Sequence, residues 1–567
     1  MLTFKQILHL PSQLFDNRWL QAQQKSILSA ATVITVANLL VSLSGLLRDR
    51  LMLAKFAGSD TLLEAYDAFR VAFQIPDLIY QLVILGALSA SFVPIFTSLK
   101  KKSTKDAFDL VNVAMNWLLL IFAVISIIIA IFAPQITHLR IGDAYTASQI
   151  EIVINLTRIM MMAQLFFAVS SFFSGMLQSY QRFIVPALVP LLYNGGIVAG
   201  TYIFFPYFGI YAAGIGVILG AFLHMLLQIP AISRLEWHYQ FNWNLKTVGI
   251  KKLFAMMPAR TLTLGMSEVQ NLGLSYFVTS IAGYGYTMII LARQLILMPI
   301  RFVGVPIGQA SLPFLSDLSD EENIARFKKI VLQSLNQIAY LSCPIAIILL
   351  ILRIPAVRLA FGTRNFSWEL TVMVGRLVAI MAISIPVQAM FHLLVRAFHA
   401  LKDTLTPFLI SVVTTIIFFI GAALAVQLPD NQLYGIAITI AVTAFLETAL
   451  YFIFLNHKLK HLFDSNFVLT QIKIYAITAI TGLALYIPFK LLDNLVFNTA
   501  KVIPLLMLTF ITGAVGLSVY ILLSKLFHIQ EMQIVVNIFQ NFRRIRAKEK
   551  EQLLLPSTEI INDPPEN

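Results

Sequence analysis

Long apolar stretches recur along the whole chain, and each one is long enough to cross a lipid bilayer. A hydrocarbon core of about 30 Å needs roughly 20 apolar residues in a helix, and fourteen stretches reach this length. Of all residues 58% are hydrophobic and 12% are charged, whereas about 25% are charged in soluble domains. We therefore predict an all-α polytopic membrane protein with transmembrane helices over residues 28–47, 67–98, 110–134, 152–178, 185–206, 209–231, 253–282, 284–316, 330–352, 368–399, 405–427, 433–456, 468–489 and 502–524.

Basic residues are distributed unequally between alternate loops. With the N-terminus in the cytoplasm, most of the 41 Lys and Arg residues fall on the cytoplasmic side, whereas the outer loops 207–208, 283 and 428–432 contain none. The positive-inside rule then places both termini in the cytoplasm. The net charge of +13 is explained by these topology signals and by attraction to anionic lipids, so we expect no nucleic-acid partner.

Three segments lie outside the predicted helical bundle. Residues 1–27 form a cytoplasmic interfacial segment rather than a signal peptide, because Pro11 and Asp16 interrupt any apolar core. Residues 232–252 contain four aromatic side chains among polar ones, which predicts an amphipathic cytoplasmic linker. We predict that residues 528–567 form a cytoplasmic tail.

The residues that usually carry catalysis or bind metals are sparse. The one cysteine, Cys343, excludes an intramolecular disulfide. The chain contains neither an HExxH pair nor a GxxxxGK[ST] phosphate loop. Asp67 and Asp77 would lie about 15 Å apart along a helix, too far for a shared acid–base pair. We expect neither an enzyme nor a protein with a cofactor or a metal site.

A weak internal repeat relates the two halves of the chain. The helix end at Pro94 matches the one at Pro313, and the helix start at Pro186 matches the one at Pro407, each about 220 residues apart. Six helices per copy give both copies the same orientation, which is the architecture of alternating-access carriers. We predict an N-terminal lobe over 28–231, a C-terminal lobe over 253–456 and two additional helices within 457–527.

Several ionisable residues lie inside the predicted helices, where they are costly unless they line a cavity or find partners. Arginines outnumber carboxylates there, and Arg binds phosphate oxygens in bidentate fashion, so we predict an anionic substrate. For Arg158 and Arg396, which lie near helix ends, we favour snorkelling or an internal ion pair over cavity lining. The pair Gly216 and Gly220 predicts close helix packing. We expect a net positive cavity lined by arginines that are not paired with carboxylates: Arg48, Arg260, Arg293 and Arg301.

Several motifs, taken in order, resemble the MurJ (MviN) family of lipid II flippases, in the multidrug/oligosaccharidyl-lipid/polysaccharide exporter superfamily. The likeness covers most of residues 28–460. It rests on Gly45-Leu46-Leu47-Arg48-Asp49, Asp67-Ala68-Phe69, Phe73-Gln74-Ile75-Pro76, Met257-Pro258-Ala259-Arg260 and the run from Arg396 to Thr404.

The resemblance implies two six-helix lobes and a groove for a polyprenyl tail formed by the two last helices. It implies movement of the undecaprenyl-diphosphate-linked peptidoglycan precursor from the inner to the outer leaflet of the bacterial cytoplasmic (inner) membrane. The partners would be this lipid-linked anionic glycan, membrane lipids and proteins of cell-wall synthesis, and we expect a monomer.

The cationic residues of the family are only partly present. Arg48 and Asp67 stand where the family has them, whereas Ser42, Leu85 and Gln294 replace an Arg, a Glu and an Arg. Arg293 lies one position before Gln294, which turns its side chain by about 100° on a helix. We expect Arg70 and Arg301 to supply the displaced positive charge. The predicted substrate-binding residues are Arg48, Asp67, Arg70, Arg260, Arg293, Gln294 and Arg301.

Two alternatives remain open at this point. The chain could carry another polyprenyl-diphosphate-linked glycan, or it could be a non-transporting scaffold of a cell-envelope complex.

The predicted topology can be tested by cysteine labelling. The Ser148→Cys variant should react with a membrane-impermeant thiol reagent in intact cells, because the loop at residues 140–148 is predicted to lie outside. The Ser103→Cys variant should not react until the membrane is permeabilised. The reverse pattern would overturn the topology.

Overall fold

The regular secondary structure of the described residues is entirely helical, because a backbone in hydrocarbon must satisfy its hydrogen bonds within one segment or a closed barrel. The computed structural model describes residues 27–85, 92–281, 283–495 and 501–533, without the side chains of 27–35, 83–85, 257–265, 267, 321 and 494–495. Ten helices in these ranges are long and apolar enough to cross a membrane, or eleven if one broken pair counts as a span. The all-α polytopic fold is confirmed, and the count of fourteen stays a prediction.

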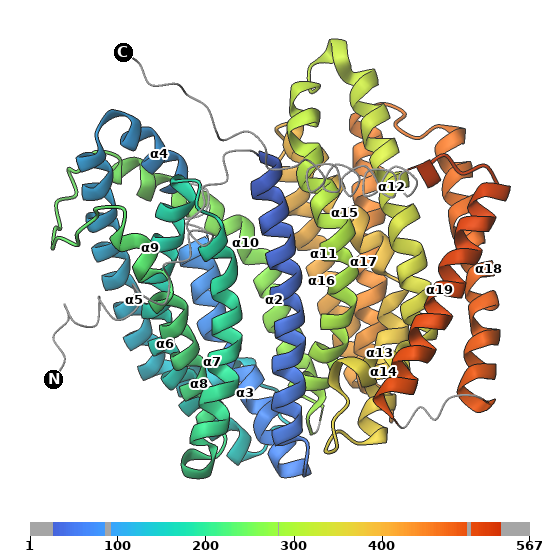
Figure 1. Ribbon diagram of the computed structural model, residues 1–567, viewed down its shortest axis with the longest axis horizontal. Coiled ribbons are helices and arrows are strands. Elements are labelled where there is room, and N and C mark those ends of the chain that lie inside the picture. Colours follow the sequence, from blue (N-terminus) through green and yellow to red (C-terminus); the bar gives the residue numbers. More distant parts are fainter. Residues whose placement is uncertain (1–26, 86–91, 282, 496–500, 534–567) are drawn as a thin grey trace, which may run out of the picture. The chain divides into compact units, whose positions relative to one another are not determined.

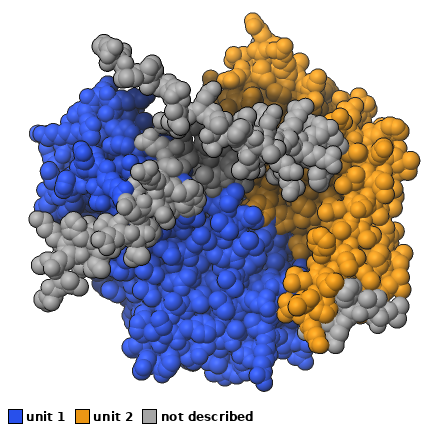
Figure 2. Space-filling model, in the orientation of Figure 1, with its two compact units in different colours: residues 1–298, 353–381, 404–447 blue, residues 299–352, 382–403, 448–567 orange. Residues whose placement is uncertain are grey.

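The chain separates into two compact units, drawn in different colours in Figure 2. Unit 1 comprises residues 1–298, 353–381 and 404–447, and unit 2 comprises residues 299–352, 382–403 and 448–567. The division into lobes at 28–231 and 253–456 stays a prediction.

Unit 1 holds the N-terminal helices and part of the later ones (Figure 1). Its helices are α2 (Ile27–Phe56), α3 (Asp60–Ile79), the π-helix η2 (Tyr80–Leu85), α4 (Val93–Lys102), α5 (Thr104–Arg140), α6 (Ala147–Ser179), α7 (Ile184–Phe208), α8 (Tyr211–Leu226), α9 (Ile229–Ser233), α10 (Ile250–Thr279), the first part of α11 (Gly285–Asp317), α13 (Arg353–Phe361), α14 (Trp368–Ala382), α16 (Leu405–Val426) and the first part of α17 (Gln432–Lys458).

Unit 2 holds the remaining parts of α11 and α17 with the C-terminal helices. Its other helices are the 3₁₀-helix η4 (Glu321–Asn323), α12 (Ile324–Ile351), α15 (Ile385–Ala400), α18 (Ser465–Leu495) and α19 (Val502–Leu526). The α18 and α19 helices lie side by side (Figure 1), and the Tyr520 hydroxyl of α19 donates to the Tyr340 carbonyl of α12 at 3.0 Å. The predicted lipid-tail groove along these two helices stays a prediction.

Two predicted helices differ from single α-helices. Within the one predicted over 67–98, the α-helix α3 passes into the π-helix η2 at Tyr80, and α4 begins at Val93 after residues 86–91, which lie outside the described residues. Pro76 near the end of α3 lacks the N–H that would continue the ladder, and single π-helical turns often mark functional sites. In place of one helix over 368–399, α14 ends at Ala382 and α15 begins at Ile385, because Pro386 favours the first turn of a new helix.

Glycines bring α7 and α8 of unit 1 into close contact. A Cβ on Gly216 would lie 2.5 Å from the Ile197 carbonyl oxygen, and one on Gly220 would lie 2.6 Å from that of Tyr193. These distances are far below van der Waals contact, so no side chain fits at either position. The predicted packing role of the Gly216 and Gly220 pair is confirmed.

We predict that Gly220→Val lowers the melting temperature of the detergent-purified protein. The valine would push the α7 backbone away from α8, and overpacking of this kind costs about 1–3 kcal/mol. The matched control is Gly195→Ala on α7, where an added Cβ meets nothing within 4 Å. Equal melting temperatures for the two variants would contradict this packing.

Candidate functional site

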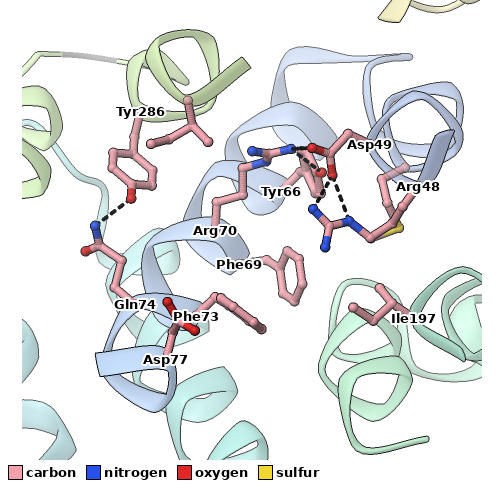
Figure 3. Close-up of a pocket in the computed structure, with 12 residues that line it drawn as sticks. Arg48, Asp49, Tyr66, Phe69, Arg70, Phe73, Gln74, Asp77, Ile197 and Tyr286 are labelled. Carbon is pink, nitrogen blue, oxygen red and sulfur yellow. Dashed lines mark hydrogen bonds and ion pairs between the residues drawn. The ribbon is translucent and has the colours of Figure 1, made fainter. Parts of the chain in front are cut away.

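A buried carboxylate of α2 joins two arginines in unit 1 (Figure 3). The Asp49 side chain is 2% exposed, and its oxygens lie 2.8 Å from Arg48 Nη2 and 3.1 Å from Arg70 Nη2. Arg70 also donates to the Tyr66 hydroxyl at 3.0 Å. Two guanidiniums around one carboxylate leave one net positive charge.

Helical spacing produces this arrangement. Residues three and four apart share one face of a helix, so Tyr66, Arg70, Phe73 and Asp77 of α3 point the same way. The α2 helix ends at Phe56 rather than at the predicted residue 47. Arg48 and Asp49 therefore lie within α2, where they meet the polar face of α3.

The three charged residues line a cavity of about 220 Å³. Phe69 and Phe73 form apolar walls, and Tyr286 of α11 lies opposite (Figure 3). Asp77 also lines it and accepts from Gln81 Nε2 at 2.8 Å. The charged residues of the lining are therefore two arginines and two aspartates, and the predicted net positive cavity stays a prediction. A water molecule occupies about 30 Å³ in the liquid, so the cavity has room for a phosphate-sized polar group but not for a whole lipid-linked sugar.

Arg48 is oriented by a second set of bonds. Its Nη1 donates to the Asn194 side-chain oxygen at 3.1 Å, and the Asn194 amide donates to the Ser44 hydroxyl at 2.8 Å. These contacts direct the guanidinium between α2 and α7. The expectation that Arg48 has no carboxylate partner is wrong, because the low dielectric between membrane helices makes an unpaired charge expensive.

Asp67 lies outside the cavity and caps a helix instead. Its side chain is fully buried, and its oxygens accept from the Thr287 backbone N–H at 2.5 Å and from the Tyr145 hydroxyl. Thr287 belongs to the first turn of α11, where unpaired N–H groups and the helix dipole favour a carboxylate. Asp67 therefore holds α3 against the start of α11.

A buried arginine extends this contact. Arg140, in the last turn of α5, donates to the Gln74 side chain at 2.8 Å and to the Val71 carbonyl at 2.7 Å. Gln74 in turn donates to the Tyr286 hydroxyl at 2.5 Å. The bonds made by Asp67, Arg140 and Gln74 join the interior of α3 to the last turn of α5 and the first turn of α11, and we call them the end closure.

The remaining predicted residues lie on α10 and α11. Arg293 donates to the Asn271 side chain at 3.3 Å, about one turn of α11 beyond the cavity residue Ile290. Gln294 faces α2, because a Cβ on Gly45 would lie 3.7 Å from its Nε2. Arg301 belongs to unit 2 and is exposed. The Arg260 side chain lies outside the described residues.

The structure thus brings Arg48 and Arg70 together and adds partners that the sequence analysis missed. Tyr66 could have been found, because it precedes Arg70 by one helical turn. Arg140, Tyr145 and Asn194 are distant in sequence from their partners, and no local pattern identifies them.

A comparison with known families decides the classification. The family model described as "Lipid II flippase MurJ" matches residues 53–506. The chain belongs to the MurJ family. The family predicted from the sequence motifs is confirmed.

Individual MurJ proteins are similar to this chain over most of its length. The lipid II flippase MurJ of Burkholderia cenocepacia is 27% identical over 443 residues, which cover 76% of this chain and 84% of the relative. The probable lipid II flippase MurJ of Bdellovibrio bacteriovorus is 26% identical, covering 70% of this chain and 76% of the relative.

Solved structures share the fold. A lipid II flippase MurJ in an inward closed conformation superimposes with a TM-score of 0.72 at 19% identity, covering 88% of this chain and 99% of that one. An inward-facing MATE family multidrug resistance transporter of the MOP superfamily gives a TM-score of 0.60 at 13% identity, covering 76% and 98%.

We predict that Asp49→Asn destabilises this MurJ family member. The amide leaves two arginines without their shared anion, and breaking a buried pair costs about 3–5 kcal/mol. The Arg48 side chain is 27% exposed, so water can compensate in part and the loss should lie near 3 kcal/mol. The readout is the melting temperature in detergent. The exposed Asp143→Asn is the control, and an equal melting temperature for both variants would contradict the role of Asp49.

Proposed function

We propose that this chain moves lipid II from the inner to the outer leaflet of the bacterial inner membrane by alternating access. Membership in a family of lipid II flippases supports the substrate, and the MurJ and MATE folds support a carrier rather than a channel. The observation that carries the proposal is the Arg48–Asp49–Arg70 cluster, a cationic group in a cavity between membrane helices.

The cluster suits the diphosphate of the substrate. Guanidinium groups bind phosphate oxygens with paired hydrogen bonds. Arg48 is the more accessible of the two, at 27% exposed against 10% for Arg70, so it makes the first contact. Asp49 screens the repulsion between the two arginines while the cavity is empty. The same carboxylate limits how tightly the cluster holds an anion, which favours release.

The end closure supplies one gate of the carrier. It joins the last turn of α5 to the first turn of α11, and both lie on the outer side in the predicted topology. Hydrogen bonds to charged groups such as Asp67 and Arg140 contribute about 1.5–3 kcal/mol each, and neutral hydrogen bonds about 0.5–1.5 kcal/mol, when water can replace the partner. The closure therefore excludes water in one state and opens at a cost that substrate binding can offset.

The membrane potential supplies the driving force in this proposal. A diphosphate carries about two negative charges, and outward movement from a negative interior gains about 2.3 kcal/mol per charge per 100 mV. In alternating access the lobes rock around a nearly fixed site, so the arginines move little and do not cancel this gain. Both termini would face the cytoplasm, and the chain would act as a monomer.

We predict that vesicles containing the purified protein move lipid II to the opposite leaflet, and that collapse of an imposed potential with an ionophore slows the movement several-fold. The measurement is the fraction of lipid II that becomes accessible to an enzyme added outside. Unchanged movement after a verified collapse would exclude the potential as the energy source.

Two controls separate the substrate from the mechanism. Arg48→Gln should reduce the rate at least tenfold, whereas Arg158→Gln should not, because Arg158 is exposed and donates to the Ala130 carbonyl. An unrelated polyprenyl-diphosphate glycan in the same vesicles tests specificity, and faster movement of that glycan would favour a different lipid-linked substrate. No movement of either lipid would favour the scaffold.

A further inference from the structure

A second cavity lies in unit 2, between the first turns of α12 and α18 and the segment that follows α19. Its volume is about 770 Å³, within the range of about 300–1,000 Å³ typical of ligand pockets. All three helix ends lie on the cytoplasmic side in the predicted topology. The proposed transport mechanism does not use this cavity.

Lysines give the cavity a net positive charge. Lys328, Lys329 and Lys473 line it, against two carboxylates, Asp464 and Glu531. Asp464 is already engaged, because its Oδ1 accepts from the Phe467 N–H at 2.7 Å in the first turn of α18. The excess of cations favours an anionic group.

Two of the three lysines, Lys328 and Lys473, contact backbone carbonyls. Lys328 Nζ donates to the Lys460 carbonyl at 2.9 Å, and Lys473 Nζ lies 3.5 Å from the Phe527 carbonyl. Each ammonium has three N–H donors, so both keep donors for a ligand. Lys460 and the nearby His528 adopt left-handed backbone angles, with φ of 47° and 53°, a conformation that costs energy in non-glycine residues and often marks functional sites.

One carboxylate oxygen of a residue that lines the cavity accepts no hydrogen bond from the described residues. Glu531 lines the cavity, and its Oε2 is buried without a hydrogen-bond partner among the described residues. Such an atom loses its hydration without compensation. A ligand with a hydroxyl or ammonium group beside its anion would satisfy it.

The cavity continues into an apolar face. Leu469 lines it and is 52% exposed, and Ile472 and Leu483 farther along α18 are 60% and 72% exposed. Residues spaced in this way form a stripe along the helix. A membrane helix presents such a stripe to lipid chains.

We propose that this cavity binds the headgroup of an inner-leaflet phosphoglyceride. The phosphate contacts Lys329 and Lys473, a hydroxyl or ammonium group of the headgroup donates to Glu531 Oε2, and an acyl chain lies along Leu469 and Ile472. A soluble sugar phosphate offers the same polar groups, but the apolar stripe of α18 favours the lipid. The bound lipid would join α12, α18 and the segment after α19.

The first test measures phosphatidylglycerol binding to the full chain in detergent by native mass spectrometry. Lys329→Gln with Lys473→Gln should weaken binding at least tenfold. The matched control is Lys402→Gln with Lys525→Gln, which removes the same charge at exposed positions outside the cavity. If the double variant is unstable, Lys329→Gln alone should still weaken binding severalfold, because Lys329 is exposed and its side chain buries little surface. Equal affinity in the cavity and control variants overturns the proposal.

The second test changes the ligand. Phosphatidylmethanol keeps the phosphate but lacks the donor, so it should bind more weakly than phosphatidylglycerol, and Glu531→Gln should reduce this difference. Diacylglycerol should show no dependence on the two lysines. Displacement of phosphatidylglycerol by glycerol 3-phosphate at similar concentration would identify a soluble-anion site and overturn the proposal. Displacement by lipid II through the same lysines would make the cavity part of the substrate path and overturn it as well. Neither test depends on transport.

Discussion

The cost of a charge between membrane helices governs the best-defined part of this structure. Arg48 and Arg70 would repel each other in a low dielectric, and each would be expensive alone. Asp49, 2% exposed, lies between them and makes their proximity possible. Three other features surround this shared carboxylate. The α2 helix extends beyond residue 47, a tyrosine lies one turn before Arg70, and a cavity lies beside α2 and α3. A functional cation is therefore available only because a structural anion lies beside it.

The end closure meets a different requirement, because the contacts that close a carrier must break again at a small cost in free energy. Its contacts are bonds to a backbone N–H, to a backbone carbonyl, to hydroxyls and to an amide, and Asp67 is not paired with a cation in them. Removing one partner of a buried ion pair costs about 3–5 kcal/mol, whereas a hydrogen bond to a charged group contributes about 1.5–3 kcal/mol when water can replace the partner. In the proposed alternating access, Asp67 would become hydrated when α11 moves away from α3. The α3 helix thus carries both an ion cluster and a separate hydrogen-bonded contact. In the proposed mechanism the cluster would persist while the hydrogen-bonded contact opens and closes.

The sequence predicts local features of the molecule better than contacts between distant residues. Apolar length predicts the helices, because it follows from bilayer thickness, and the spacing of Gly216 and Gly220 predicts the contact of α7 with α8. The single helix predicted over 368–399 is wrong, because hydropathy does not register a proline at a helix start. Hydropathy also does not register the change from α to π geometry at Tyr80, within the helix predicted over 67–98. The partner of Asp67 is 220 residues away at Thr287, and that of Arg140 is 66 residues away at Gln74. Such pairs depend on which helix ends meet, and that information is in the tertiary structure.

The Arg48–Asp49–Arg70 cluster offers a physical explanation for the positions at which this chain differs from its family's pattern of cationic residues. Ser42 and Gln294 remove two positive charges that the family resemblance leads one to expect, while Arg70 adds one beside Arg48. A carrier must bind its anionic substrate weakly enough to release it. Each additional guanidinium raises the affinity for the anion through charge-assisted hydrogen bonds. With Asp49 in place the cluster keeps one net positive charge, which in the proposed mechanism would attract a diphosphate without neutralising it. The substrate would then retain net negative charge at the site, on which a membrane potential can act.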